Sequence, residues 1–318
     1  MVTGGWANDD SSSCTFHSVR HTGAGIYNDA GNPTIRRSLL KGNESRCNGC
    51  AIYNRSDSRP TFIDVRITSN AARIRSGGAI FSSSSSPELM RVEISGNTAG
   101  QHGGGIWTSG SLKLVDAVLS DNHASDNGGA IYFSAGTMTL TNAALSGNLA
   151  SLGGGIFHGG DSSIITNVVI VSNRATSTST FYGSSGGINS ATNAQIRNTI
   201  IWGNQRGSVV GSADASFTGS PIVRYSLIQG RNPEGDGNFD CSELCPDPRF
   251  VETLDSNLSP SSSGDFRLQP GSPAIDTGNN DFVEVDFDLD GFPRIQNGIV
   301  DLGPYEAEGP IFHDRFEQ

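Results

Sequence analysis

Apolar residues recur along this chain at fixed distances before a repeated asparagine. The asparagines lie 25 to 31 residues apart, at Asn43, Asn70, Asn97, Asn122, Asn148, Asn173 and Asn204. Three positions before them stand Leu40, Ile67, Ile94, Leu119, Leu145, Ile170 and Ile201. Eight positions before them stand Ile35, Phe62, Leu89, Leu114, Leu140, Ile165 and Ile196. Two apolar columns in phase with a polar marker indicate a structural repeat.

A Gly-rich tetrapeptide ending in isoleucine is a second marker of the same period. The isoleucines are Ile26, Ile52, Ile80, Ile106, Ile131, Ile156 and Ile188. The runs between the markers are short and β-branched, which is typical of strands joined by tight turns. Glycine suits sharp corners because it adopts positive φ without strain. Leucine-rich repeats have a similar period, but the helical or turn half-unit that they need is absent from this pattern.

A unit of about 26 residues made of short strands cannot bury its own apolar face, whereas stacked units share a narrow core. We therefore predict an all-β fold, a parallel β-helix (solenoid) of about seven to eight coils spaced about 4.8 Å apart. The coils span residues 23–230, with 1–22 as a lead-in or cap. Residues 231–306 are expected to form an acidic C-terminal cap, because an open last coil exposes strand edges, and 307–318 a tail.

The polar columns have a structural and a ligand-binding interpretation. We expect the repeated asparagines to bond the backbone at a corner and one another in a ladder, and a ligand role is the alternative. Six positions before them, four charged residues of alternating sign precede three amides: Arg37, Asp64, Arg91, Asp116, Asn142, Asn167 and Asn198. Stacked coils would turn this column into an ion ladder followed by an amide ladder.

An aromatic residue follows the repeated isoleucine in six units: Tyr27, Tyr53, Phe81, Trp107, Tyr132 and Phe157. If isoleucine points inward, alternation places this row on the outer face. The rings then stack on one another or are covered by loops. The alternative is a platform for sugar rings, with Tyr53, Phe81, Trp107, Tyr132 and Phe157 as candidate ligand-binding residues.

Composition and charge narrow the function classes. The chain is 35% hydrophobic with 41 glycines, so a conventional compact core is doubtful. Residues 231–318 carry a net charge of −14, whereas residues 1–230 carry +3, which gives −11 overall. With no clustered basic stripe, we expect no nucleic-acid partner. No stretch approaches the roughly 20 apolar residues of a transmembrane span, and residues 1–25 lack a signal-peptide pattern. We expect a soluble chain from which any export signal has been removed.

The Gly-Gly-Ala-Ile tetrapeptides followed by Ile/Leu-x-x-Asn, as in Ile94–Asn97, resemble the repeats of polymorphic outer-membrane proteins of bacteria. This resemblance covers about residues 20–230 and implies a right-handed β-helix, the hand that parallel crossovers also favour. An eighth coil through Ile222–Gly230 precedes the blocks DPRF, DFRLQPGSPAIDTG, DFDLDGFPR and VDLGPYE. Their order over residues 222–306 resembles the C-terminal region of secreted choice-of-anchor Q proteins.

These resemblances imply a secreted or cell-surface protein of a Gram-negative bacterium. The final IFHDRFEQ is similar to a short sorting tail of exported proteins, with Arg315 in place of the usual Gly. An outer-surface anchoring or secretion system is therefore an expected partner.

Asp286, Asp288, Asp290 and Gly291 form D-x-D-x-D-G, the opening of a calcium loop. Asn297 stands where the loop would supply its bidentate carboxylate, and Pro293 falls inside the loop, so we do not expect a full EF-hand. Two interpretations remain open. One is a looser calcium site completed by Asp301 or Glu306, with calcium as the one candidate cofactor, and the other is a solvated acidic turn in which Arg294 pairs with a carboxylate.

The five cysteines suit an exported protein with disulfides. Cys241 and Cys245 can close a local loop, and Cys14 can pair with Cys47 or Cys50. Zinc at Cys47-x-x-Cys50 lacks the second ligand pair that a structural zinc site needs.

Three functions compete. The preferred hypothesis is a non-catalytic, adhesin-like or glycan-binding solenoid that binds a polysaccharide or a cell-surface glycan. The alternative is a polysaccharide lyase or glycoside hydrolase acting on the solenoid face, for which Arg91, Glu93 and Asp116 are weak candidates. The third is a structural spacer. A groove of converging acidic or basic groups would favour the enzyme, and a flat exposed aromatic face would favour binding.

Overall fold

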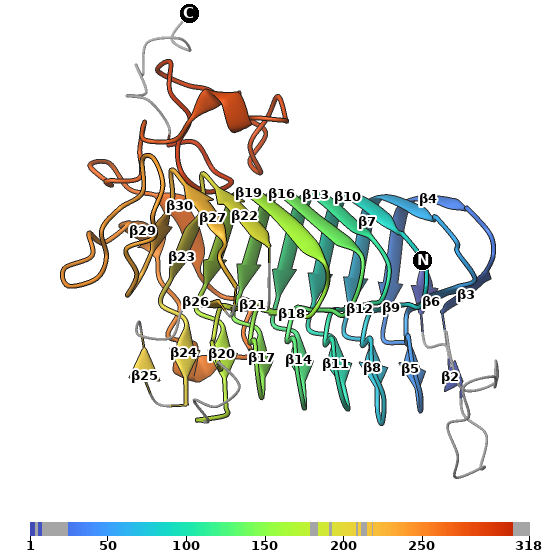
Figure 1. Cartoon of the computed structure of the whole chain (residues 1–318). Helices are drawn as coiled ribbons and strands as arrows, with labels where there is room; N and C mark the ends of the chain where they lie inside the picture. Colours follow the sequence, from blue (N-terminus) through green and yellow to red (C-terminus); the bar gives the residue numbers. More distant parts are fainter. Residues whose placement is uncertain are drawn as a thin grey trace, which may run out of the picture.

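The chain winds into a parallel β-solenoid of about seven turns in the computed structural model (Figure 1). The structure describes residues 1–3, 6–7, 25–178, 184–190, 193–207, 209–210, 215–217 and 219–307. Three sheets run along the solenoid, and each complete turn contributes a strand to every sheet. The all-β parallel architecture predicted from the repeat is therefore confirmed.

The first sheet holds the longest strands. They are β4 Thr34–Lys41, β7 Thr61–Thr68, β10 Glu88–Ser95, β13 Leu112–Ser120, β16 Thr137–Ser146, β19 Ser162–Val171, β22 Ala194–Arg197 and β27 Ile222–Arg224, joined by β1 Val2–Thr3, β23 Ile200–Trp202 and β28 Leu227–Ile228.

The second sheet consists of two-residue strands. They are β2 Trp6–Ala7, β5 Glu44–Ser45, β8 Ala71–Ala72, β11 Thr98–Ala99, β14 His123–Ala124, β17 Leu149–Ala150, β20 Arg174–Ala175, β24 Gln205–Arg206 and the antiparallel β25 Val209–Val210. The third sheet contains β3 Ile26–Asp29, β6 Ile52–Arg55, β9 Ile80–Ser82, β12 Ile106–Thr108, β15 Ile131–Phe133, β18 Ile156–His158, β21 Ile188–Ser190 and β26 Ala215–Phe217.

Equivalent residues of successive repeats lie side by side, which builds the core. Ile94 pairs in register with Ile67 on one side and Leu119 on the other. Members of the two apolar columns are at most 1% exposed, except Ile35 of the first turn, which is partly buried. The core is thus a continuous stack of like side chains inside the three sheets.

Each long strand of the first sheet bends at a residue with left-handed backbone. The bend falls on the charged and amide column, with φ between 47° and 57° at Arg37, Asp64, Arg91, Asp116, Asn142, Asn167 and Asn198. The strand pairing skips this position in each strand, as between Met90 and Val92. Left-handed backbone costs an ordinary residue about 1–2 kcal/mol, and Asn and Asp tolerate it best.

Two adjacent glycines shape the corner before the third sheet in the middle turns, as at Gly103 and Gly104. Gly103 has φ of +66°. At Gly104 a Cβ would lie 2.5 Å from the carbonyl oxygen of Gly129 in the next turn. The first glycine therefore supplies the left-handed conformation, and the second allows the turns to approach.

The repeated asparagines form a buried ladder along the solenoid. Asn97 Oδ1 accepts hydrogen bonds from the backbone N and the Nδ2 of Asn70, at 3.0 and 2.8 Å. Asn97 Nδ2 in turn donates to Asn122 Oδ1 at 3.0 Å and to the carbonyl of Ile67 at 2.9 Å. The same pattern continues to Asn204. Each asparagine thereby ties one turn to the next and satisfies buried backbone groups.

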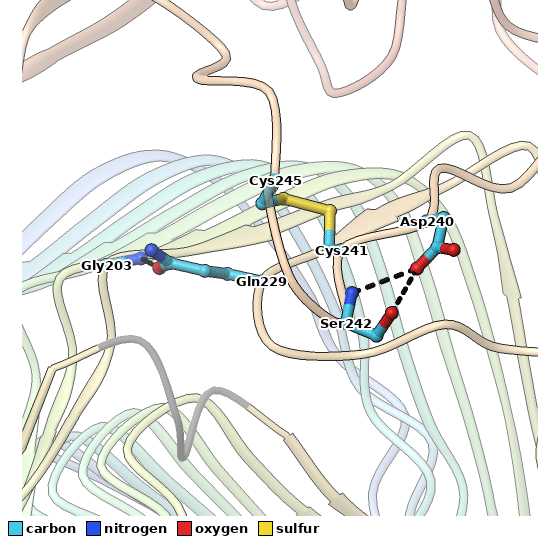
Figure 2. Close-up of a disulfide and its surroundings, with 6 residues drawn as sticks. All are labelled: Gly203, Gln229, Asp240, Cys241, Ser242 and Cys245. Carbon is cyan, nitrogen blue, oxygen red and sulfur yellow. Dashed lines mark hydrogen bonds between the residues drawn. A yellow bond between two sulfur atoms is a disulfide. The ribbon is translucent and has the colours of Figure 1, made fainter.

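The C-terminal segment, residues 231–307, first adds to the last turn. The backbone N of Tyr225 donates to Asp236 O, and that of Phe239 donates to Ser226 O. Figure 2 shows the disulfide between Cys241 and Cys245 that follows. Ser242 donates to Asp240 from its backbone N and its Oγ, at 3.0 and 2.6 Å (Figure 2).

The C-terminal segment then runs back along the outer face of the first sheet, which a simple end cap would not do. Outward residues of the later turns, including Ala144, Val169 and Ile200, form a second apolar cluster with Phe250, Phe266, Leu268 and Leu302. In earlier turns the positions paired with these are Leu39, Arg66, Glu93 and Val118. The charged members Arg66 and Glu93 lie in turns outside the second apolar cluster, and the members within the cluster are all apolar.

Short elements order the C-terminal segment itself. An antiparallel pair, β29 Phe250–Glu252 and β30 Asp265–Leu268, is its only sheet within the described part. The segment also contains two 3-10 turns, η2 Ser256–Leu258 between these strands and η3 Asn280–Phe282 after them. The Gly147 carbonyl accepts the Ser261 amide, and Asn198 Oδ1 accepts the Asn279 amide at 2.9 Å, so both the loop and the later chain are bonded to the solenoid.

Candidate functional site

A pocket of about 340 Å³ lies where the C-terminal segment meets the open part of the first sheet. The solenoid contributes Val118 and Ser120 of β13 and Ala144 and Ser146 of β16. The C-terminal segment contributes Ser262, Gly264, Asp265, Phe266, Arg267, Asp290 and Tyr305. The pocket therefore has a small, neutral wall from the solenoid and a charged wall from the segment.

Strand β30 positions two of the charged groups. Its alternate residues Phe266 and Leu268 are buried against the second apolar cluster. Side chains alternate along a strand, so Asp265 and Arg267 share the opposite face. Arg267 Nε donates to both carboxylate oxygens of Asp265, at 2.9 and 3.1 Å, and Arg267 Nη2 also contacts Asp265 Oδ2. This bond holds the pKa of the Asp265 carboxyl below its usual value, so the group is a carboxylate at neutral pH.

A tight turn positions Asp290 near Arg267. Asp288 Oδ1 accepts the backbone amides of Asp290 and Phe292, at 2.9 and 2.8 Å. Its Oδ2 accepts the backbone amide of Glu306 at 2.9 Å. Asp290 Oδ2 then lies 3.9 Å from Arg267 Nε, so the guanidinium of Arg267 serves two carboxylates.

Tyr305 adds a phenol to the pocket wall that the C-terminal segment forms. Burial raises the pKa of the Tyr305 phenol, and the nearby carboxylates of Asp290 and Asp265 raise it further. Both effects disfavour a negative charge on the oxygen. The phenol therefore stays protonated and can donate or accept a hydrogen bond.

The calcium interpretation of Asp286, Asp288 and Asp290 is not supported by their geometry. Within the described ranges, no three Asp, Glu, His or Cys side chains are placed to share a metal ion. Asp288 is committed to three backbone amides, as described above. The residues expected to complete the site are also engaged: Asp301 accepts the amides of Asp276 and Ala307 at 2.7 and 2.6 Å, and Glu306 pairs with Arg294. The carboxylates stabilise the turns of the segment instead.

The weak catalytic candidates lie on the exposed outer face of the first sheet, each with a partner in a neighbouring turn. Arg91 Nε donates to Asp64 Oδ1 at 2.7 Å, and Arg66 Nε donates to Glu93 Oε2 at 2.7 Å. Asp116 Oδ1 accepts from Asn142 Nδ2 at 2.6 Å. The structure does not bring Arg91, Glu93 and Asp116 into the pocket.

The aromatic column stacks upon itself. Successive rings from Tyr27 to Phe157 are nearly parallel, with centroid distances of 5.3, 5.1, 4.2, 6.3 and 5.1 Å. The closest pair is Phe81 and Trp107, and His102 also stacks on Tyr132. Because ring faces contact other rings, the column offers a ligand mainly ring edges. The candidate ligand-binding residues Tyr53, Phe81, Trp107, Tyr132 and Phe157 are thus not a flat exposed platform.

The cysteines near the first turns are not a metal site in this geometry. Cys47 is disulfide-bonded, and Cys14, which was expected to pair with either Cys47 or Cys50, lies outside the described residues. Cys50 is a free, buried thiol that contacts the carbonyl of Asn43 at 2.7 Å. Burial raises the pKa of Cys50 to about 12, so it stays an unreactive thiol.

Sequence patterns missed the pocket, although its residues lie in conspicuous blocks. Asp265 and Arg267 open the block Asp265–Gly278, and Tyr305 closes the block Val300–Glu306. From these blocks the sequence predicts only an end cap. The available signal was the outward column, which changes from Arg66 and Glu93 to Ala144 and Val169 and so indicates a covered face.

Comparison with known proteins agrees with this architecture. A family model described as "Right handed beta helix region" matches residues 51–222, more than half of the chain. The chain therefore belongs to the right-handed β-helix family, which agrees with the right-handedness predicted for the solenoid. No curated protein matches the sequence significantly. The fold is common to adhesins, lyases and hydrolases, so function must be argued from the site.

Proposed function

We propose that this protein is a non-catalytic, glycan-binding solenoid that a Gram-negative bacterium exports to its surface or surroundings. The observation that carries the proposal is the pocket at the edge of the C-terminal segment. Its volume of about 340 Å³ lies within the range of small-molecule sites. Serine hydroxyls, planar charged groups and a tyrosine line it, and such groups form hydrogen bonds to sugar hydroxyls.

The surface next to the pocket suits an elongated ligand. The outer face of β7, β10 and β13 is not covered by the second apolar cluster and carries Thr68 and Ser95, which are partly exposed, in register with Ser120, which is 6% exposed. Neighbouring turns are about 4.8 Å apart, so this row offers hydroxyls at a regular spacing. A linear glycan can follow the row toward the pocket.

Two exposed aromatic rings lie close to Asp290 in the chain. Phe287 and Phe292, on either side of Asp290 in the chain, are 58% and 41% exposed. The carbonyl of Phe287 accepts from Asn142 Nδ2 at 3.2 Å, which fixes this loop to the solenoid beside Asp116. Exposed rings on a fixed loop are better placed to stack on a sugar than the self-stacked aromatic column.

The charge pairing in the pocket favours binding over catalysis. A glycosidase needs one carboxyl group that stays protonated as general acid. Arg267 lowers the pKa of Asp265, so Asp265 is held as a carboxylate and does not suit the general-acid role. The presence of two carboxylates in one pocket keeps a glycoside hydrolase as the second candidate function.

The disulfides support export to an oxidising compartment. Cys241 and Cys245 are joined, and Cys47 is also disulfide-bonded. Disulfides persist mainly in secreted and surface proteins. Within the described ranges, no helix has the length and apolarity that crossing a membrane requires. The sorting-like tail, whose residues 308–318 lie outside the described part, is proposed to engage an anchoring or secretion system.

Affinity electrophoresis and pull-down against neutral, acidic and amino polysaccharides test the proposal. We expect retention on at least one glycan, a loss of at least tenfold in affinity for Tyr305→Phe combined with Arg267→Ala, and no release of reducing ends or unsaturated uronates. Glu243→Gln, an exposed change elsewhere on the segment, is the control. Product release abolished by Asp265→Asn or Asp290→Asn would establish the hydrolase instead, and no retention on any glycan would overturn the binding function.

A further inference from the structure

Charged side chains on the open part of the first sheet bind one another from turn to turn. Strands β4, β7, β10 and β13 carry four acidic residues, Asp64, Glu88, Glu93 and Asp116, and six basic ones, Arg36, Arg37, Lys41, Arg66, Arg91 and Lys113. Three of the acids form ion pairs with N–O distances of 2.7 Å: Asp64 with Arg91, Glu93 with Arg66, and Glu88 with Lys113. The fourth, Asp116, accepts from Asn142 Nδ2 at 2.6 Å. The carboxylates of these strands are therefore all engaged.

The three basic residues of β4 remain. Arg36, Arg37 and Lys41 are exposed, and their side chains form no ion pair or hydrogen bond with the described part of the chain. Asp64 is close enough for the charges of Arg37 and Arg36 to lower its pKa, but its carboxylate is bound by Arg91. On the other side of β4 lies β1, whose residues carry no charged side chain. The face therefore has an excess of positive charge at its first complete turn.

The backbone of Arg37 makes its unpaired side chain more notable. Its φ of 48° lies in the left-handed region, which costs a residue with a Cβ about 1–2 kcal/mol. The next turn has Asp64 at this position, and Asp tolerates the conformation better. Arg91 has the same strain but gains an ion pair in return. At Arg37 no ion pair within the described ranges offsets the cost, which indicates that its guanidinium serves a partner outside the chain.

Lys41 begins a row of polar side chains that leads to the pocket. It pairs in register with Thr68, which pairs with Ser95, and Ser95 pairs with Ser120 of the pocket lining. With turns about 4.8 Å apart, Lys41 lies about 14 Å from Ser120 along the solenoid. One turn is comparable in length with one sugar of an extended glycan, so about four sugars reach from β4 to the pocket.

The same distance separates the cations of β4 from the acidic C-terminal segment. The second apolar cluster and the pocket lining take no residue from β4 or β7. The Debye length is about 8 Å at physiological ionic strength, so charges of the segment are largely screened at β4. The positive potential there is thus available to a ligand.

We propose that the open face binds an acidic glycan, whose carboxylate or sulfate groups are held by Arg36, Arg37 and Lys41 while the sugar chain follows the polar row toward the pocket. A planar guanidinium binds such oxyanions through two parallel hydrogen bonds, and lysine adds a point charge. This inference rests on the proposed glycan-binding function and adds the class of ligand and a second region of contact.

Calorimetric titration of the full chain with matched hexasaccharides tests the ligand class. The ligands are hexagalacturonate, its fully methyl-esterified form, a sulfated galactan hexasaccharide and cellohexaose. We expect at least one acidic hexasaccharide to bind at least tenfold more tightly than the methyl ester, because esterification removes the charge. High salt should reduce this preference. The ratio between the two acidic ligands identifies the anionic group.

A charge-matched pair of variants locates the effect. Arg36→Gln combined with Lys41→Gln should reduce the preference for the acidic glycan to within about threefold. Arg224→Gln combined with Arg249→Gln also removes two exposed positive charges, at the last turn and in the segment, and should leave the preference unchanged. Circular dichroism and retained affinity for the methyl ester show that each variant is folded.

Arg37→Asn gives a second, independent test. Asn removes the charge and suits left-handed backbone better than Arg does. We therefore expect this variant to bind the acidic glycan at least threefold more weakly and yet to resist urea better than the parent. A purely structural role of Arg37 would move stability and leave affinity unchanged, which would contradict the proposal.

The outcomes separate the two proposals. Equal binding of acidic and esterified glycans, or a preference that the double variant of β4 keeps, overturns the acidic-glycan assignment and leaves glycan binding standing. Binding of a glutamate hexapeptide as tight as that of the acidic glycan overturns it in favour of an acidic peptide. A dimer in sedimentation velocity that the same double variant abolishes assigns the cations to a second copy instead. Absence of binding to every glycan overturns the proposed function itself.

Discussion

Arg294 pairs with Glu306 inside the C-terminal segment, where each side chain is only 1% exposed. The guanidinium also donates to the carbonyls of Asp301 and Gly303. Burial lowers the pKa of Arg294 to about 10, against the opposing effect of Asp301 and Asp288. Arg294 therefore remains charged at neutral pH and links the turn that bears Asp290 to the stretch of chain that bears Tyr305.

Removing one partner of this ion pair should destabilise the C-terminal segment more than replacing both partners with apolar residues. Glu306→Ala leaves a buried guanidinium without its carboxylate, at a cost of about 3–5 kcal/mol. Arg294→Met combined with Glu306→Leu removes both charges and should recover most of that loss. Limited proteolysis followed by mass spectrometry measures opening of residues 231–307. A double variant as susceptible as Glu306→Ala would contradict this account.

The asparagine ladder should be indispensable to the solenoid. In Asn97→Ala, the buried amide of Asn70 and the carbonyl of Ile67 lose their side-chain partners. Two such groups at about 1–3 kcal/mol each imply a loss of about 4 kcal/mol in the free energy of unfolding. Urea denaturation measures it, and the exposed neighbour Thr98→Ala should change stability by less than about 0.5 kcal/mol. Equal effects of the two substitutions would exclude a structural ladder.

His158 should make the solenoid less stable in acid. It is buried beside Phe133, and neither ring nitrogen has a hydrogen-bond partner among the described residues. Burial lowers the pKa of His158 below the usual 6.5. The unfolded chain therefore binds the proton more readily, so this stability is fully present above about pH 6.5 and is lost as the pH falls below it.

His158→Phe removes both the unpaired nitrogens and the titration. We expect it to stabilise the protein by about 1–3 kcal/mol at neutral pH, with a larger gain at pH 5. Urea denaturation at both pH values gives the difference between variant and parent, which cancels the contributions of His102 and His123. A difference that does not depend on pH would show that His158 is not the titrating group.

Trp107 should contribute to stability and not to glycan affinity. Its ring stacks on Phe81 with a centroid distance of 4.2 Å, and Tyr132 lies on the other side. Trp107→Ala should cost about 2–3 kcal/mol, because stacking and burial are lost together. Affinity for the glycan retained by the parent should stay within twofold. A loss of affinity without a loss of stability would restore the aromatic column as the ligand site.

Several parts of the molecule could be predicted from single columns of the alignment of repeats. The apolar columns of Ile94 and Leu89 identify the core, because stacking in register places equal positions of successive turns next to each other. The bends at Arg91 and Asp116 were not predicted as left-handed, since the column contains arginines, which are rare in that conformation. The self-stacking of the aromatic column also required the structure. Alternation along a strand predicts that these side chains point outward, but it does not predict what their ring faces contact.

The sequence by itself determined the solenoid: its period, its inward columns, its glycine corners and its asparagine positions. These features are periodic, and in a parallel coil a residue contacts its counterpart one repeat away, so the pattern and the contact are the same information. The tertiary structure alone decided the pocket. Asp265, Arg267, Asp290 and Tyr305 meet Ser120 and Ser146 only because the C-terminal segment folds back over turns more than 100 residues earlier. That segment has no repeat, and its position depends on burial of the outward apolar residues of the later turns, a packing preference that no local pattern specifies.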